Sequence, residues 1–136
     1  NRPANSELID NLSNDQRLVA YKKNIESLIG LARQHGGIEV VLSTYAFRKE
    51  KYKSGVIERD EAILAAIENQ IGKMNEIVRQ IAEDHRLVLV DTAIALAPYL
   101  DDYLVDDCHF NDQGQQARAA LVFDHIERDL PKQSVN

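Results

Sequence analysis

The chain alternates between long segments with helical periodicity and short apolar runs. Apolar side chains recur at helical spacing in residues 14–35, 58–85 and 112–129. Between these segments, residues 38–43 and 87–91 are rich in valine, isoleucine and leucine, which is typical of buried strands. Helices and strands that alternate along a chain are joined by crossover connections, and these make the strands parallel. The sequence therefore predicts an α/β fold with a parallel sheet.

Signals at the ends of two helices support this interpretation. Ser13 and Gln16 have the spacing of a capping box, in which each side chain satisfies a free backbone N–H group at a helix start. Gly36 and Gly37 are expected to end the same helix, because glycine adopts the left-handed conformation of a C-terminal cap. Pro131 follows the last helix and marks its end.

Two strands are few for the helices that surround them. Two parallel strands cannot cover the apolar faces of three helices, and small sheets need further strands for stability. We therefore interpret residues 1–136 as a single α/β unit, the second half of a larger domain. Its first half would lie on another piece of chain, or the unit would complete its sheet by self-association. The start at Asn1 rather than methionine fits a fragment or processed product, and localisation is left open.

The composition excludes several classes of partner. A net charge of −6 argues against nucleic acid, because phosphate binding needs clustered lysine and arginine. A short basic run at residues 48–53 contains Glu50 and is typical of a solvated loop. No apolar stretch approaches the ~20 residues that a membrane-spanning helix requires. Cys108 is the only cysteine, so the chain forms no internal disulfide.

A metal site is not predicted either. One cysteine and four dispersed histidines show none of the spacings that metal ligands adopt. The alternative is an oxygen-rich ion site formed by Asp106, Asp107, Asp112 and His109. We disfavour it because a histidine among hard oxygen ligands suits Ca²⁺ poorly.

After the second strand, an irregular loop that contains Pro98 is expected to lead to residues 106–111. The residues that point to chemistry lie there, just before the last helix. Asp106 and His109 are three residues apart, so a short loop can direct both side chains toward one pocket. A carboxylate in that position fixes the tautomer and orientation of the imidazole, which can then take a proton from a nucleophile. Loops that follow strands are also where open α/β sheets place their sites. Asp106 and His109 are therefore candidate catalytic residues.

Nearby polar residues have simpler interpretations. Cys108 adjoins His109, but neighbours in an extended segment point to opposite sides, which favours a structural thiol. Ser43 ends a strand without the sharp G-x-S-x-G turn that exposes a nucleophilic serine. Asn111 is expected to cap the last helix. Tyr45 follows the first strand and is a candidate for lining a substrate pocket.

Much of the chain resembles the SGNH (GDSL) hydrolases. Residues 21–33 fit the family's helix Y-x-x-N-L…I-x-x-A-R, and residues 40–45 resemble the strand and loop after it. Residues 74–82 and 89–91 resemble the next helix and strand. Residues 106–114 match the closing block D-x-x-H-x-N-x-x-G. The order and spacing of these segments make the resemblance specific.

The resemblance implies a three-layer α/β/α, flavodoxin-like fold and hydrolysis of small-molecule esters without a cofactor. His109 would be the general base that activates a serine, and Asp106 would hold His109. Asn1 would stand where the family has the asparagine of its G-x-N-D motif, which binds substrate. The family's nucleophilic serine lies in a G-D-S motif, and this sequence contains none. The nucleophile is therefore expected outside these 136 residues.

Two classes of function remain open from the sequence. The first is the C-terminal part of an esterase, lipase or carbohydrate deacetylase that supplies the Asp–His pair of a catalytic triad. The second is a truncated, non-catalytic α/β module that associates through its unfinished sheet and uncovered helix faces.

Overall fold

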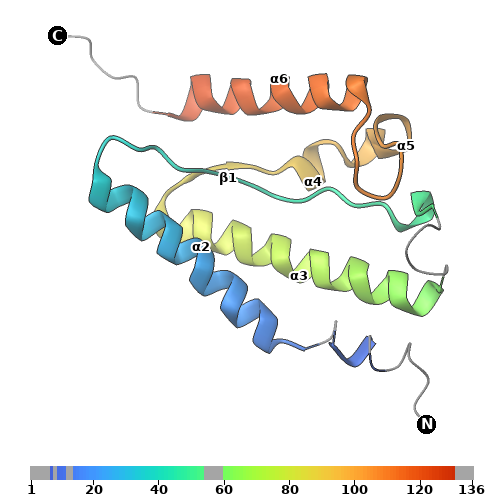
Figure 1. Ribbon diagram of the computed structural model, residues 1–136. Helices are drawn as coiled ribbons and strands as arrows, with labels where there is room; N and C mark the ends of the chain where they lie inside the picture. The colour runs from blue at the N-terminus through green and yellow to red at the C-terminus, as the bar shows by residue number, and fades with distance from the viewer. Residues whose placement is uncertain (1–6, 8, 12–13, 54–59, 131–136) are drawn as a thin grey trace.

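The computed structural model describes residues 7, 9–11, 14–53 and 60–130 (Figure 1). In chain order, its elements are α2 (Gln16–His35), β1 (Val41–Ser43), the 3-10 helix η1 (Lys49–Lys51), α3 (Glu61–His85), β2 (Val88–Val90), α4 (Thr92–Ala95), the 3-10 helix η2 (Ala97–Tyr99), α5 (Leu100–Tyr103) and α6 (Asp112–Asp129). The fold is mixed α/β, mostly helical, with a small parallel sheet.

The three long helices predicted from periodicity are confirmed. Helix α2 ends where predicted, since Gly36 and Gly37 both have a positive φ, of 65° and 66°. At the start of α2, Asn14 accepts a hydrogen bond from the backbone N–H of Gln16, at 2.9 Å. The predicted capping partner Ser13 lies outside the described residues. Helix α3 begins after Asp60, whose carboxylate accepts from two backbone N–H groups of the first turn.

The two strands pair in parallel, as predicted. Val41 lies opposite Val88, and Ser43 lies opposite Val90. Helix α3 contacts both strands and α6 contacts β2, and Figure 1 shows the strands passing between α6 and the pair α2 and α3. Both strands therefore have helices packed against them. A larger flavodoxin-like sheet stays a prediction.

Two local expectations differ from the structure. The first strand is shorter than residues 38–43, because only the last three of these residues pair with β2. The connection between β2 and the loop at residues 104–111, expected to be irregular, folds into the short helices α4, η2 and α5. Elements of three or four residues are too short to show a helical period, and hydrophobic periodicity therefore does not predict them.

A small apolar core supports that loop. Its buried members come from the segment after β1, from η2 and its neighbours, and from the loop itself: Ala46, Leu96, Leu100 and Leu104. Half-buried side chains packed against them include Tyr103, Phe110, Ala117 and Leu121. Because α6 contributes to this core, the helix and the loop before it are held together.

The close packing of α6 against α5 depends on Gly114. A Cβ at this position would lie 2.6 Å from the carbonyl oxygen of Tyr103 and 2.7 Å from Cδ1 of Phe110. We expect Gly114→Ala to lower the free energy of unfolding by ~1–3 kcal/mol, because the backbone of α5 must shift. Urea denaturation measures the effect.

Gly72→Ala is the matched control. Gly72 lies inside α3, and a Cβ there meets nothing within 4 Å. This substitution should raise stability by ~0.5–1 kcal/mol, since alanine loses less backbone entropy in a helix. Equal effects of the two substitutions would show that Gly114 is not required for close packing.

Candidate active site

The loop at residues 104–111 is fixed by hydrogen bonds at both of its ends. Leu104 and Phe110 form an isolated antiparallel bridge, and the backbone N–H of Val105 donates to the carbonyl of His109 at 2.9 Å. Asn111 caps α6 as predicted, because its side chain accepts from the N–H of Gly114 at 2.8 Å. Its amide also donates to the carbonyl of Asp102 at 2.7 Å. The loop is therefore a closed turn rather than an extended segment.

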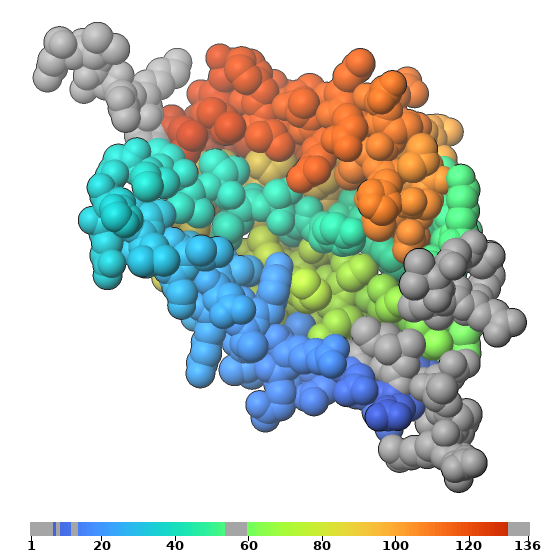
Figure 2. All heavy atoms as spheres, viewed as in Figure 1, coloured from blue at the N-terminus to red at the C-terminus, as the bar shows by residue number. Residues whose placement is uncertain are grey.

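The segment after β1 lies against this loop. The backbone N–H of Arg48 donates to the carbonyl of Asp107 at 2.8 Å. In Figure 2, the teal atoms that follow β1 adjoin the orange atoms of the loop and of the start of α6. Residues that are distant in sequence thus meet at the end of β1.

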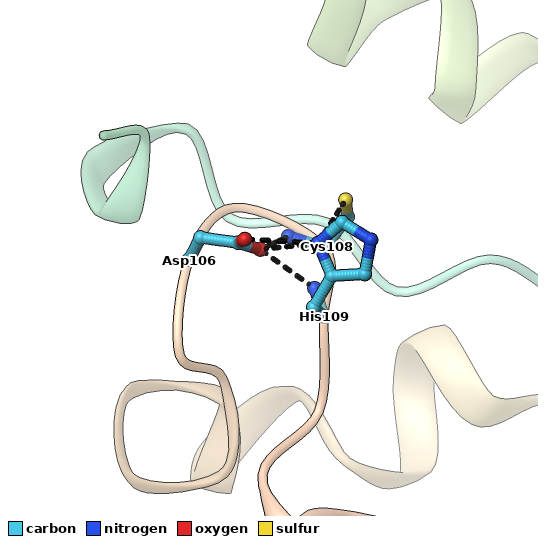
Figure 3. A group of neighbouring side chains, drawn as sticks. All are labelled: Asp106, Cys108 and His109. Carbon is cyan, nitrogen blue, oxygen red and sulfur yellow. Dashed lines mark hydrogen bonds and ion pairs between the residues drawn. The ribbon is translucent and has the colours of Figure 1, made fainter. Parts of the chain in front are cut away.

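Asp106 and His109 contact one another directly. The Nδ1 atom of His109 lies 2.8 Å from Oδ2 and 3.0 Å from Oδ1 of Asp106 (Figure 3). The Oδ1 atom also accepts from the backbone N–H groups of Cys108 and His109, at 3.0 and 2.8 Å. These backbone hydrogen bonds, with a smaller contribution from the imidazole, lower the pKa of Asp106 to about 2. The carboxylate is therefore ionised near neutral pH and oriented toward the ring.

The other ring nitrogen of His109 is open. Hydrogen bonding to a carboxylate places the proton of a neutral imidazole on Nδ1, which leaves the lone pair on Nε2. Within the part of the chain that the structure describes, Nε2 has no hydrogen-bond partner, and the side chain is 73% exposed. Figure 3 shows Nε2 pointing away from Asp106. An imidazole held this way can accept a proton from a group that approaches Nε2.

His109 borders a cleft of about 270 Å³. The cleft is lined by residues 44–46 after β1, by Thr92 after β2, by residues 108–110 of the loop, and by Gln115 and Arg118 of α6. Both strands thus end at this cleft, at the carboxyl edge of the sheet where open α/β folds bind their ligands.

Tyr45 lines this cleft. The sequence predicts that this residue lines a substrate pocket. The residue is 51% exposed, and its backbone is held by the buried amide of Asn75 through two hydrogen bonds, of 2.7 and 2.9 Å. Burial, followed by the contact with Cys108 and the charges of Asp107 and Asp106, raises the pKa of Tyr45 to about 12. The phenol therefore keeps its proton and can donate a hydrogen bond. Its role in substrate binding stays a prediction, and Asn1 lies outside the described residues.

A partly buried polar network fixes the ends of the two strands next to the cleft. The hydroxyl of Thr44 donates to Asp91 at 2.7 Å and accepts from the N–H of Ala93 at 2.9 Å. Arg79 donates to both carboxylate oxygens of Asp91, at 2.7 and 3.2 Å. Burial opposes ionisation of Asp91, but these hydrogen bonds outweigh it and lower its pKa. The network ties α3, β1 and β2 together next to the site.

Ser43 is part of the same strand edge and not of the Asp–His pair. Its hydroxyl lies 2.8 Å from the hydroxyl of Thr92. Among the residues that the structure describes, no serine hydrogen-bonds to His109. This geometry agrees with the interpretation of Ser43 as a structural residue.

The expectation that Cys108 and His109 point apart is wrong. The Sγ atom of Cys108 lies 3.6 Å from Nδ1 of His109, because the loop turns at this point instead of running extended (Figure 3). Burial raises the pKa of the thiol, which disfavours a thiolate nucleophile. Asp106, Cys108 and His109 also form a group that could hold a metal ion, with one ligand atom from each within 4.8 Å of the others.

Sequence reasoning missed two residues at the site. Asn75 lies on the apolar stripe of α3 with Ile71 and Val78, and a polar residue in such a stripe signals a buried hydrogen bond. Arg118 follows Gln115 by three residues on α6, so both face the cleft. The helical spacing of residues in the sequence is a signal that identifies both Asn75 and Arg118.

These features define an α/β protein with an aspartate-held histidine at the carboxyl edge of a parallel sheet. A sequence model of the GDSL-like lipase/acylhydrolase family matches residues 7–117. The match covers most of the 136 residues, and the chain belongs to this family. At the level of the family, it is a hydrolase of ester substrates.

Searches of curated proteins and of solved structures found no significant match. Among the described residues, no helix combines the length and the apolar character needed to cross a membrane.

The depressed pKa of Asp106 makes a prediction about acid stability. Its pKa is about 2 in the folded chain, against ~3.9 for an unfolded aspartate. The ionised carboxylate therefore stabilises the fold above about pH 4, and this contribution is lost as the pH falls toward 2. We expect the stability difference between the wild type and Asp106→Asn, measured by urea denaturation, to shrink between pH 5 and pH 2. A difference that is constant over this range would contradict the assignment.

Proposed function

We propose that this chain supplies the Asp–His pair of a serine hydrolase that acts on esters. The observation that carries the proposal is the orientation of His109, which lines the cleft with Nδ1 on Asp106 and an exposed side chain. Membership of the GDSL-like lipase/acylhydrolase family supports the class of reaction. Esterase, lipase and carbohydrate deacetylase activities all fit this chemistry.

The proposed reaction uses His109 twice. Its Nε2 takes the proton of a serine hydroxyl while the serine oxygen bonds to the ester carbonyl carbon. The C–O bond of the ester then breaks, and the alcohol leaves with the proton from Nε2. Water repeats the sequence on the acyl-serine and releases the acid. Asp106 holds the ring and stabilises the imidazolium that forms in each step.

We infer that the serine lies outside these 136 residues. The sequence contains no G-D-S motif, and the described residues provide no serine in contact with His109. The sheet described here has two strands, which supports a unit that continues into a larger three-layer, flavodoxin-like domain. In that proposal residues 1–136 are the C-terminal part of one domain. Tyr45 lines its substrate pocket, and Asn1 corresponds, by its place in the sequence, to the family's substrate-binding asparagine.

Substitution of His109 tests the proposal. In the protein that carries both the nucleophile and this chain, His109→Ala should lower kcat for ester hydrolysis by at least ~10³-fold, because the serine loses its general base. Asp106→Asn should lower kcat by ~10²–10⁴-fold by disturbing the tautomer. Hydrolysis of a p-nitrophenyl ester measures both effects.

His35→Ala is the matched control, since His35 is exposed at the end of α2, away from the cleft. Its rate should equal that of the wild type. The 136-residue chain alone should show no hydrolysis above background. Full activity in His109→Ala would refute the catalytic role, and activity of the chain alone would place the nucleophile within it.

A second candidate function is a non-catalytic interaction module. It is favoured by large apolar side chains that remain exposed on α2 and α6, including Leu28 at 65% and Phe123 at 58%. Such exposed surface drives association. We expect the chain alone to elute from a sizing column above its monomer mass of 15.4 kDa. Leu28→Gln and Phe123→Gln should shift it toward the monomer, whereas a wild type that is monomeric would count against both the module and the incomplete sheet.

A further inference from the structure

We propose that Asp106, Cys108 and His109 form a binding site for Zn²⁺ or a similar borderline-soft divalent ion, and that its occupation switches off the Asp–His pair. The inhibitory part rests on the proposed function, whereas the binding site does not. The three residues lie in one turn and offer a carboxylate oxygen, a thiol sulfur and an imidazole nitrogen. This donor set is typical of zinc and unsuited to Ca²⁺ or Mg²⁺, which prefer oxygen ligands.

Two of the separations between ligand atoms are near those of a tetrahedral ion. With a Zn–S bond of ~2.3 Å and a Zn–N bond of ~2.0 Å, tetrahedral geometry separates sulfur and nitrogen by ~3.5 Å. Sγ of Cys108 and Nδ1 of His109 are 3.6 Å apart. The same geometry separates nitrogen and oxygen by ~3.3 Å, so Oδ2 of Asp106, now 2.8 Å from Nδ1, has to move away by about half an ångström. The sulfur and the carboxylate oxygen lie within 4.8 Å of one another and have to reach ~3.5 Å.

The carboxylate of Asp106 is already oriented to bind a metal ion. Its Oδ1 accepts from the backbone N–H groups of Cys108 and His109. Among the described residues, Oδ2 hydrogen-bonds to the ring of His109 alone. Oδ2 can therefore bind an ion while Oδ1 keeps both backbone hydrogen bonds. Hydrogen bonds of this kind orient a ligand and raise its affinity for a metal.

The site is also open to an ion from solvent. The side chain of His109 is 73% exposed and that of Asp106 is 29% exposed. Cys108 and His109 both line the cleft, which leaves room for water as a fourth ligand. Three protein ligands and one open position make a complete coordination shell for zinc.

Binding would reverse the tautomer that the proposed reaction needs. The thiol of Cys108 releases its proton to solvent, and the sulfur bonds to the ion. Nδ1 of His109 also bonds to the ion through its lone pair, so the imidazole proton moves from Nδ1 to Nε2. A protonated Nε2 has no lone pair for the proton of a serine. Metal binding therefore stops the reaction at its first step, and a chelator restores it.

Cobalt binding tests the site in the chain alone. Because Cys108 is the only cysteine, a thiolate-to-Co²⁺ charge-transfer band in the near ultraviolet would come from this residue. We expect such a band with one equivalent of Co²⁺, its displacement by Zn²⁺, and no displacement by Ca²⁺. Titration of ¹⁵N-labelled protein with Zn²⁺ should move the proton of His109 from Nδ1 to Nε2.

Three variants and one control complete the test. Cys108→Ser should abolish the band, and Cys108→Ser, His109→Ala and Asp106→Asn should each weaken zinc binding in calorimetry by at least ~10-fold. His35→Ala should bind as the wild type does, and circular dichroism should show that every variant is folded. Absence of the band, or equal zinc affinity of the wild type and Cys108→Ser, would overturn the site.

The two proposals fail in different ways. If the cobalt band forms but His109→Ala leaves ester hydrolysis intact, the metal site stands and the catalytic role falls. If hydrolysis requires His109 but no band forms, the catalytic role stands and the metal site falls. Where both hold, Zn²⁺ should inhibit the wild type reversibly and should inhibit Cys108→Ser, relative to its own zinc-free rate, much less.

Discussion

The hydrogen bonds that Asp106 accepts from the backbone of its own turn determine the geometry of the whole site. Two N–H groups hold Oδ1, and this leaves Oδ2 facing the ring of His109. The same bonds are the largest causes of the low pKa of the carboxyl, so the side chain is charged near neutral pH. The turn itself is held by the Leu104–Phe110 bridge and by Asn111 at the start of α6.

This turn lies beside the sheet because apolar packing and polar contacts act together. The small core around Leu100 and Leu104 joins the turn to α6. The hydrogen bond from Arg48 to Asp107 joins it to the segment after β1. Near the strand ends, Thr44 and Arg79 both hydrogen-bond to Asp91 and thereby connect α3 to the two strands. A histidine on a loop thereby gains the fixed position that proton transfer requires.

One turn can serve two purposes because its ligand atoms are shared. Oδ2 of Asp106 and Nδ1 of His109 form a hydrogen-bonded pair. The same two atoms, with the nearby sulfur of Cys108, form the proposed metal site. The two states exclude one another, since a proton and an ion compete for Nδ1. An Asp–His pair with a cysteine between its members is therefore open to control by metal, whereas the pair alone lacks the third ligand.

The sequence alone determined the long helices, the parallel pairing, the cap at Asn111 and the closeness of Asp106 and His109, because each depends on a local period or on a spacing of a few residues. Only the tertiary structure decided that Cys108 faces the ring, since the direction of its side chain depends on how the turn closes. It also decided that Asn75 holds Tyr45 and that Arg118 borders the cleft, because these contacts join segments far apart in the chain. Hydrophobic periodicity specifies which face of an element is buried, but not which distant backbone or side chain it meets there.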